Sequence, residues 1–141
     1  MCSSDLIRAA STADTFKAAL YFASATVNAS TTAYSVTGEV TNSSGSGYTA
    51  GGTTVTNGTA PTATNSSSTA GTAYWTPTAS FSWSALTVTT AFDAVLIYNS
   101  TQSNKAVSVH TFGSQTITAG TFTLTMPSNT TSTALIRIAT T

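Results

Sequence analysis

The residues that could carry acid, base or nucleophilic chemistry are few in this chain. His110 is the one histidine, and outside the first six residues the carboxylates are Asp14, Glu39 and Asp93. A Ser-His-Asp triad would have to use His110, and no serine lies in a Gly-X-Ser-X-Gly sequence. Because His110 alternates with Val109 in an expected strand, a hydrogen-bonded structural histidine is favoured. Two of the carboxylates could form a glycosidase-type pair only through tertiary structure.

The sequence predicts no catalytic residue, no metal site and no cofactor. His, Cys, Asp and Glu are not grouped at the spacing of metal ligands. The glycine-rich run 45–52 has neither the spacing of a dinucleotide loop nor the Lys-Ser/Thr end of a P-loop, so it is interpreted as a turn. Asp93 lies in an apolar stretch and is expected either to pair with Lys17, Lys105 or Arg137 or to be exposed. We expect a protein that is not an enzyme.

Three aromatic residues close in sequence, Tyr74, Trp75 and Trp83, leave two functions open. Their flat rings could form a platform for sugars. Packing in a core or an interface, where aromatic rings contribute large apolar area, is favoured over it. A sugar platform would also require polar and acidic neighbours.

The composition argues against several classes of partner. Charged residues make up 6% of the 141 residues, and the formal net charge is zero. More than a third of the residues are Ser or Thr, so hydroxyl groups must keep the surface hydrated. The basic residues are scattered, which argues against nucleic acid. No apolar run reaches the roughly 18 residues of a membrane span, so no membrane partner is expected either.

The first residues have an unusual sequence. Residues 2–6 read Cys-Ser-Ser-Asp-Leu, which is what the end of a common sequencing adapter encodes. We therefore treat residues 1–12 as a leader whose first six residues are not native. Cys2, the one cysteine, then says nothing about redox chemistry. Residues 13–141 are expected to form a single β domain.

Short stretches with a period of two, separated by turn residues, predict about eight strands and no long helix. Asn57-Gly58 is a hairpin signal, the polar stretch 59–72 is predicted to be a surface loop, and Pro77 suggests an edge strand. Gly113 is expected to end a strand. The expected strands are 14–22, 53–56, 73–75, 81–88, 91–99, 105–112, 121–126 and 134–139. The predicted fold is all-β, a single β-sandwich or jelly-roll-like domain of roughly eight short antiparallel strands.

The stretch 91–99, AFDAVLIYN, is expected to be the central strand. Alternation places Phe92, Leu96 and Tyr98 on one face, and Val95 and Ile97 on the other. Both faces are therefore apolar, whereas a strand of a lone sandwich should have one polar face. We expect the second face to be covered by more of the chain or by another subunit.

Several motifs resemble those of a family of small structural proteins of tailed bacteriophages, many of them known from metagenomes. The motifs follow one another over nearly the whole chain after residue 13, although the serines at 43–46 and the segment 75–77 depart from the pattern. The resemblance implies a virion structural protein. The motifs are DTFKAALY at 14–21, TTAYS at 31–35, TGEV at 37–40, GYTAGG at 47–52, AVLIYN at 94–99, NKAV at 104–107 and IRIA at 136–139.

From the pattern and the resemblance together we expect a non-enzymatic decoration or cement protein on the exterior of the phage head. It would form a homo-oligomer and bind the major capsid protein or another virion protein, stabilising the shell through buried apolar area. The alternative is a carbohydrate- or host-surface-binding β-sandwich module of a tail fibre or adhesin. The candidate interface residues are Val95, Ile97, Trp75, Trp83 and Tyr98.

Overall fold

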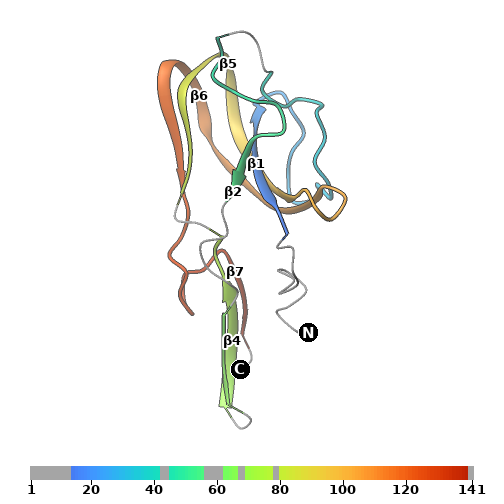
Figure 1. Ribbon diagram of the computed structural model, residues 1–141, viewed down its shortest axis with the longest axis vertical. Helices are drawn as coiled ribbons and strands as arrows, with labels where there is room; N and C mark the ends of the chain where they lie inside the picture. The colour runs from blue at the N-terminus through green and yellow to red at the C-terminus, as the bar shows by residue number, and fades with distance from the viewer. Residues whose placement is uncertain (1–13, 42–44, 56–61, 67–68, 78–79, 140–141) are drawn as a thin grey trace. The chain divides into compact units, whose positions relative to one another are not determined.

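The computed structural model describes residues 14–41, 45–55, 62–66, 69–77 and 80–139 (Figure 1). The expected leader with Cys2 and the Asn57-Gly58 turn lie outside these residues. The described residues contain seven strands and no helix. The strands are β1 (Phe16–Phe22), β2 (Thr53–Val55), β3 (Thr62–Ser66), β4 (Thr69–Trp75), β5 (Ser80–Asn99), β6 (Lys105–Thr125) and β7 (Ile136–Ala139).

The strands form two antiparallel sheets, which confirms the all-β, sandwich-like class with seven strands in place of eight. A four-stranded sheet has the order β2-β1-β5-β6, and a three-stranded sheet has the order β3-β4-β7. The described residues divide into two compact units. The larger unit holds residues 15–41, 45–55 and 81–124, and the smaller holds residues 14, 62–66, 69–77, 80 and 125–139.

Strand β1 lies between two neighbours in the four-stranded sheet, and residues on both of its faces are apolar. It pairs with the end of β5 in the register Phe16↔Asn99 to Leu20↔Val95. On its other side β2 pairs with its first three residues, in the register Phe16↔Val55 to Ala18↔Thr53. The middle of β1 is fully buried, and both of its faces therefore belong to the core.

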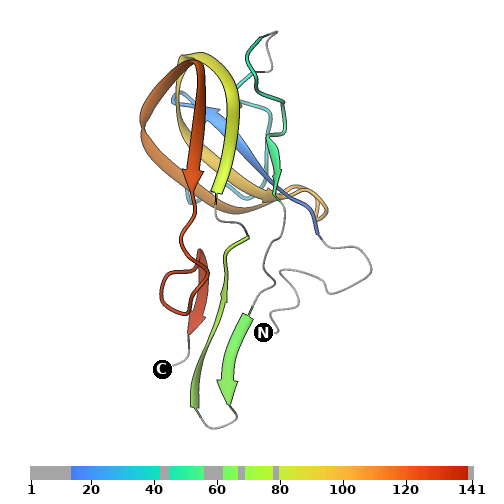
Figure 2. The same cartoon turned by 60° about the vertical axis from the view of Figure 1, so that its left-hand side comes forward.

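Strands β5 and β6 form a long hairpin that bends over itself (Figure 2). Phe112 and Phe122 are ten residues apart, which is about 33 Å in an extended strand. Their ring centroids are nevertheless only 5.0 Å apart. Phe92 contacts both rings, at 6.0 and 5.2 Å. Bends are marked by positive φ at Ala85 and Ala119, 53° and 49°. The curled sheet therefore encloses its own aromatic core.

A glycine packs against the bend in β5. A Cβ on Gly47 would lie 2.2 Å from the carbonyl oxygen of Ala85, and its φ is +68°. Two residues later along β5, the amide of Thr87 donates to the carbonyl of Ser46 at 2.7 Å. The Thr87 hydroxyl in turn accepts from the amide of Ala119 at 3.1 Å, which joins the two bends.

The smaller unit contains the three-stranded sheet. β4 is its central strand, paired with β3 on one side and with β7 on the other, where Trp75 faces Ile136. Just after β4, the Thr76 hydroxyl accepts from the amide of Leu135 at 3.0 Å. The Arg137 side chain on β7 donates to the carbonyl of Thr131 at 2.7 Å.

Three local predictions were wrong. The polar stretch 59–72 is not a loop throughout, because β3 and the first part of β4 lie within it. Pro77 does not mark an edge, since β4 before it is the middle strand of its sheet. Gly113 does not end a strand, because β6 continues through it to Thr125. In each case the pairing partner, and not the local composition, decides the conformation.

Candidate functional site

The structure gives each of the residues considered for catalysis a different environment. The ring of His110 is half-buried, its Nε2 lies 3.1 Å from the Ser108 hydroxyl, and burial lowers the pKa of the imidazole. Asp93 is partly exposed and forms no ion pair within the described part of the chain. Asp14 is buried at the start of the described chain. No hydrogen bond links His110 to a carboxylate among the described residues, so the orienting acid of a triad is missing there.

The described residues hold no group of three or more His, Cys, Asp or Glu side chains close enough to share a metal ion. They also hold no helix of the length and apolarity needed to cross a membrane.

Glu39 is the centre of the most extensive polar network in the larger unit. Its side chain is 4% exposed. Tyr48 donates its hydroxyl to Glu39 Oε1 at 2.7 Å, and the amide of Gly51 donates to the same oxygen at 2.7 Å. Tyr34 donates to Oε2 at 2.7 Å. Short hydrogen bonds to a carboxylate are strong, and three of them offset the cost of burying its charge.

Tyr48 also fills a gap in the pairing of β1. β2 pairs with β1 up to Ala18, and the next pairing on that edge is the bridge between Tyr21 and Glu39. The amide of Leu20 lies between these two pairings and donates to the Tyr48 hydroxyl at 3.0 Å. One hydroxyl therefore satisfies a buried backbone amide and a buried carboxylate together.

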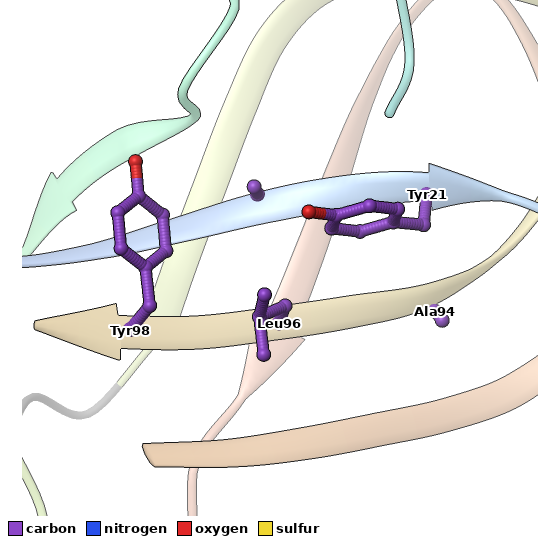
Figure 3. Close-up of a cluster of buried hydrophobic side chains, with 5 residues drawn as sticks. Tyr21, Ala94, Leu96 and Tyr98 are labelled. Carbon is purple, nitrogen blue, oxygen red and sulfur yellow. The ribbon is translucent and has the colours of Figure 1, made fainter. Parts of the chain in front are cut away.

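Two more tyrosines extend the network across the sheet. Tyr98 of β5 donates to the carbonyl of Gly51 at 2.7 Å, and its ring stacks on that of Tyr34 with centroids 4.5 Å apart. Tyr21 of β1 donates to the carbonyl of Ser35 at 2.6 Å. Figure 3 shows Tyr21 and Tyr98 projecting from the two adjacent strands, with Leu96 between Tyr98 and Ala94 along β5.

The environment of the network disfavours ionised tyrosine. Burial raises the pKa of Tyr98 to about 12, and the charge of Glu39 adds to the shift. Burial and then the hydrogen bond to Glu39 raise the pKa values of Tyr34 and Tyr48 still further. Burial also raises the pKa of Tyr21. The four hydroxyls therefore stay protonated and act as donors at neutral pH.

This arrangement holds residues 23–41 and 45–52 against the sheet. Ala25, Val27 and Tyr34 from that segment pack on a cluster that includes Leu96 and Tyr98. This segment covers the face of β5 that carries Ala94, Leu96 and Tyr98, whereas Phe92 packs on Phe112 and Phe122. The sequence left two alternatives open for the second face, and Val95 and Ile97 on that face are fully buried within the chain itself. Both carboxylate oxygens of Glu39 are occupied by donors of the fold, so the network is suited to holding structure and not to transferring protons.

The five predicted interface residues are all buried. Val95 and Ile97 have no exposed surface, Trp75 and Tyr98 are 1% and 2% exposed, and Trp83 is 5% exposed. A side chain without exposed surface cannot bury more area against a partner. In this conformation the five side chains therefore offer little area to a partner, and 1% of Trp75 and 5% of Trp83 are open to solvent.

Comparisons of the chain with protein families, with curated proteins and with solved structures returned no match. The site is therefore interpreted from its own geometry.

The network unites motifs that lie far apart in the sequence. Tyr34 and Glu39 belong to the motifs at 31–35 and 37–40, Tyr48 and Gly51 to GYTAGG, and Tyr98 to AVLIYN. The sequence alone suggested Glu39 only as a possible member of a catalytic carboxylate pair. The signal that could have indicated the network was the recurrence of tyrosine in four of the motifs, DTFKAALY, TTAYS, GYTAGG and AVLIYN.

Proposed function

We propose that this protein is a non-enzymatic structural component of a tailed-phage virion that decorates or cements the exterior of the capsid as a homo-oligomer. The observation that carries the proposal is the Glu39 network. Four of the motifs that resemble the phage family meet there, and their hydrogen bonds fix a surface segment on the sheet. A surface segment fixed in this way suits a protein that presents a constant face to its neighbours in a shell.

The surface of the larger unit fits dense packing against neighbours. The chain has 6% charged residues and no net charge, so electrostatic repulsion between copies is weak. Val36 is 71% exposed, and Ile117 and Leu124 on β6 are only partly buried. Such apolar area would stabilise a shell by about 25 cal/mol per Å² that contacts remove from water.

The test requires the capsid protein with which the chain would assemble. We would examine the genes beside the coding sequence and co-express the chain with the major capsid protein encoded there. Co-sedimentation with assembled shells, together with a higher temperature of shell disruption, is the expected result. Genes unrelated to virions, or shells that never retain the chain at saturating concentration, would refute the proposal.

The binding-module alternative makes a different prediction. A tail-fibre or adhesin domain should give a saturable signal on a glycan array, whereas a decoration protein should give none. Trp75 and Trp83 are 1% and 5% exposed, which favours the decoration role over binding of sugars on these two rings. A saturable glycan signal would restore it in place of the capsid role.

A further inference from the structure

Strand β6 is an edge that lacks the usual protection. It is the last strand of the four-stranded sheet, it is 21 residues long, and none of its residues is buried. No charged residue and no proline occurs from Ala106 to Thr125. Natural edge strands are normally protected by charges, prolines or a covering loop, because their free backbone groups otherwise pair with another strand.

The chain itself begins to pair with this edge and then turns away. The amide of Ala106 donates to the carbonyl of Thr32 at 2.9 Å, and Ala33 forms a bridge with Lys105. Immediately before, the turn at Asn28 closes on itself, because Thr31 N donates to the Asn28 carbonyl at 3.0 Å. The strand pairing therefore stops after Ala106.

An open groove follows the point where this pairing stops. It has a volume of about 460 Å³. One wall is the turn at residues 28–31 and the other is β6. Val107 and Val109 are half-buried in its wall, and Thr111 is exposed. No charged side chain lines the groove, so it suits an uncharged extended strand. The lining residues are Asn28, Ala29, Thr31, Ala106, Val107, Ser108, Val109 and Thr111.

We propose that this edge pairs with the same edge of a second copy of the chain, antiparallel about a two-fold axis near Val109. An isologous pair of this kind needs no complementary sequence, and it continues the pairing that Thr32 starts. In that register Val107 faces Thr111 and Ser108 faces His110 of the second copy, so no like charges oppose each other. Lys105 already pairs with Ala33 and lies outside the free stretch.

This inference rests on the self-association in the proposed function, but it does not need the capsid. It fails if the protein does not self-associate through β6, whereas the proposed function fails if shells do not retain the chain. The two experiments therefore separate the two failures.

The test compares Thr111→Lys with Thr54→Lys by sedimentation velocity over a range of protein concentrations. Thr111 is exposed at the β6 groove, and Thr54 is exposed on β2 at the opposite edge of the same sheet. We expect wild type and Thr54→Lys to form dimers, and Thr111→Lys to raise the dimer dissociation constant at least tenfold. A wild type that stays monomeric, or equal effects of the two variants, would overturn the proposal.

Hydrogen exchange on the wild type supplies a second measurement that does not depend on any variant folding. In a regular strand the amides of Ser108 and His110 point to the same side as that of Ala106, which is the free edge. Their exchange should slow at least tenfold as concentration rises through the dimerisation range. Dimers whose β6 amides exchange at the monomer rate would assign the contact to another surface.

Discussion

The Tyr48 hydroxyl donates to Glu39 Oε1 at 2.7 Å while accepting the amide of Leu20 at 3.0 Å. Two residues from a long irregular segment thus complete the hydrogen bonding of a buried strand. The network takes the place that a further strand would occupy beside β1, and the stability of the larger unit should depend on it.

Replacing Glu39 by Gln should lower the free energy of unfolding by about 1–3 kcal/mol, because an amide offers one acceptor oxygen where the carboxylate offers two. Tyr48→Phe should have a similar effect. Urea unfolding of both single variants and of the double variant should give a coupling of at least ~0.5 kcal/mol. Tyr74→Phe, in the smaller unit, is the control and should change stability by less than ~0.5 kcal/mol. Strictly additive effects of the two changes would show that the hydrogen bond does not couple them.

Gly52→Ala should destabilise the protein by more than ~2 kcal/mol. The residue has a φ of +75°, and a Cβ there would lie 1.9 Å from the backbone oxygen of Ala18. Gly113→Ala is the matched control, since a Cβ at that position meets nothing within 4 Å. Thermal melts of the two variants should differ clearly. An equal melting temperature for both would contradict the close approach of residue 52 to β1.

Alkaline pH should unfold the protein through its tyrosines. The folded-state pKa values of Tyr21, Tyr34, Tyr48 and Tyr98 are raised above the ordinary value of 10.0, to about 12 for Tyr98. Ionisation is therefore easier in the unfolded chain, and the stability due to these groups is complete below pH 10 and is lost as the pH rises through 12. Near-ultraviolet absorbance of tyrosinate should rise together with the loss of circular dichroism. Four tyrosines that titrate near pH 10 in a folded protein would contradict the burial of the network.

The double substitution Val95→Asp with Ile97→Asp should unfold the protein. Both side chains are completely buried, and each new carboxylate would lose its hydration without gaining a partner, so the total cost should exceed ~4 kcal/mol. Circular dichroism and a thermal melt should show no cooperative transition. Thr90→Asp, an exposed position on the same strand, is the control and should fold normally. A folded double variant that merely fails to assemble would return these residues to the interface.

The amino-acid sequence by itself determined the strand content of much of the chain. Alternation in Phe16–Phe22 and at residues 121–126, and the apolar run at 91–99, are local patterns with a period of two, and strands form at all three places. The all-β class follows from these patterns because a period of two has few other structural solutions. The low content of charged residues, and with it the weak electrostatic repulsion between copies, also follows from the sequence alone.

Only the tertiary structure decided how the strands are used. Ala85 and Ala119 adopt positive φ and bend the β5–β6 hairpin, yet alanine carries no sequence signal for such a conformation. The stretch 62–72 is rich in threonine without apolar alternation, so its strands exist because partner backbones pair with them. Glu39 accepts hydrogen bonds from donors up to 12 residues away along the chain, such as the amide of Gly51. Tyr98, which is much farther along the chain, in turn donates to the carbonyl of Gly51. Such long-range pairings arise from chain folding, which no local pattern encodes.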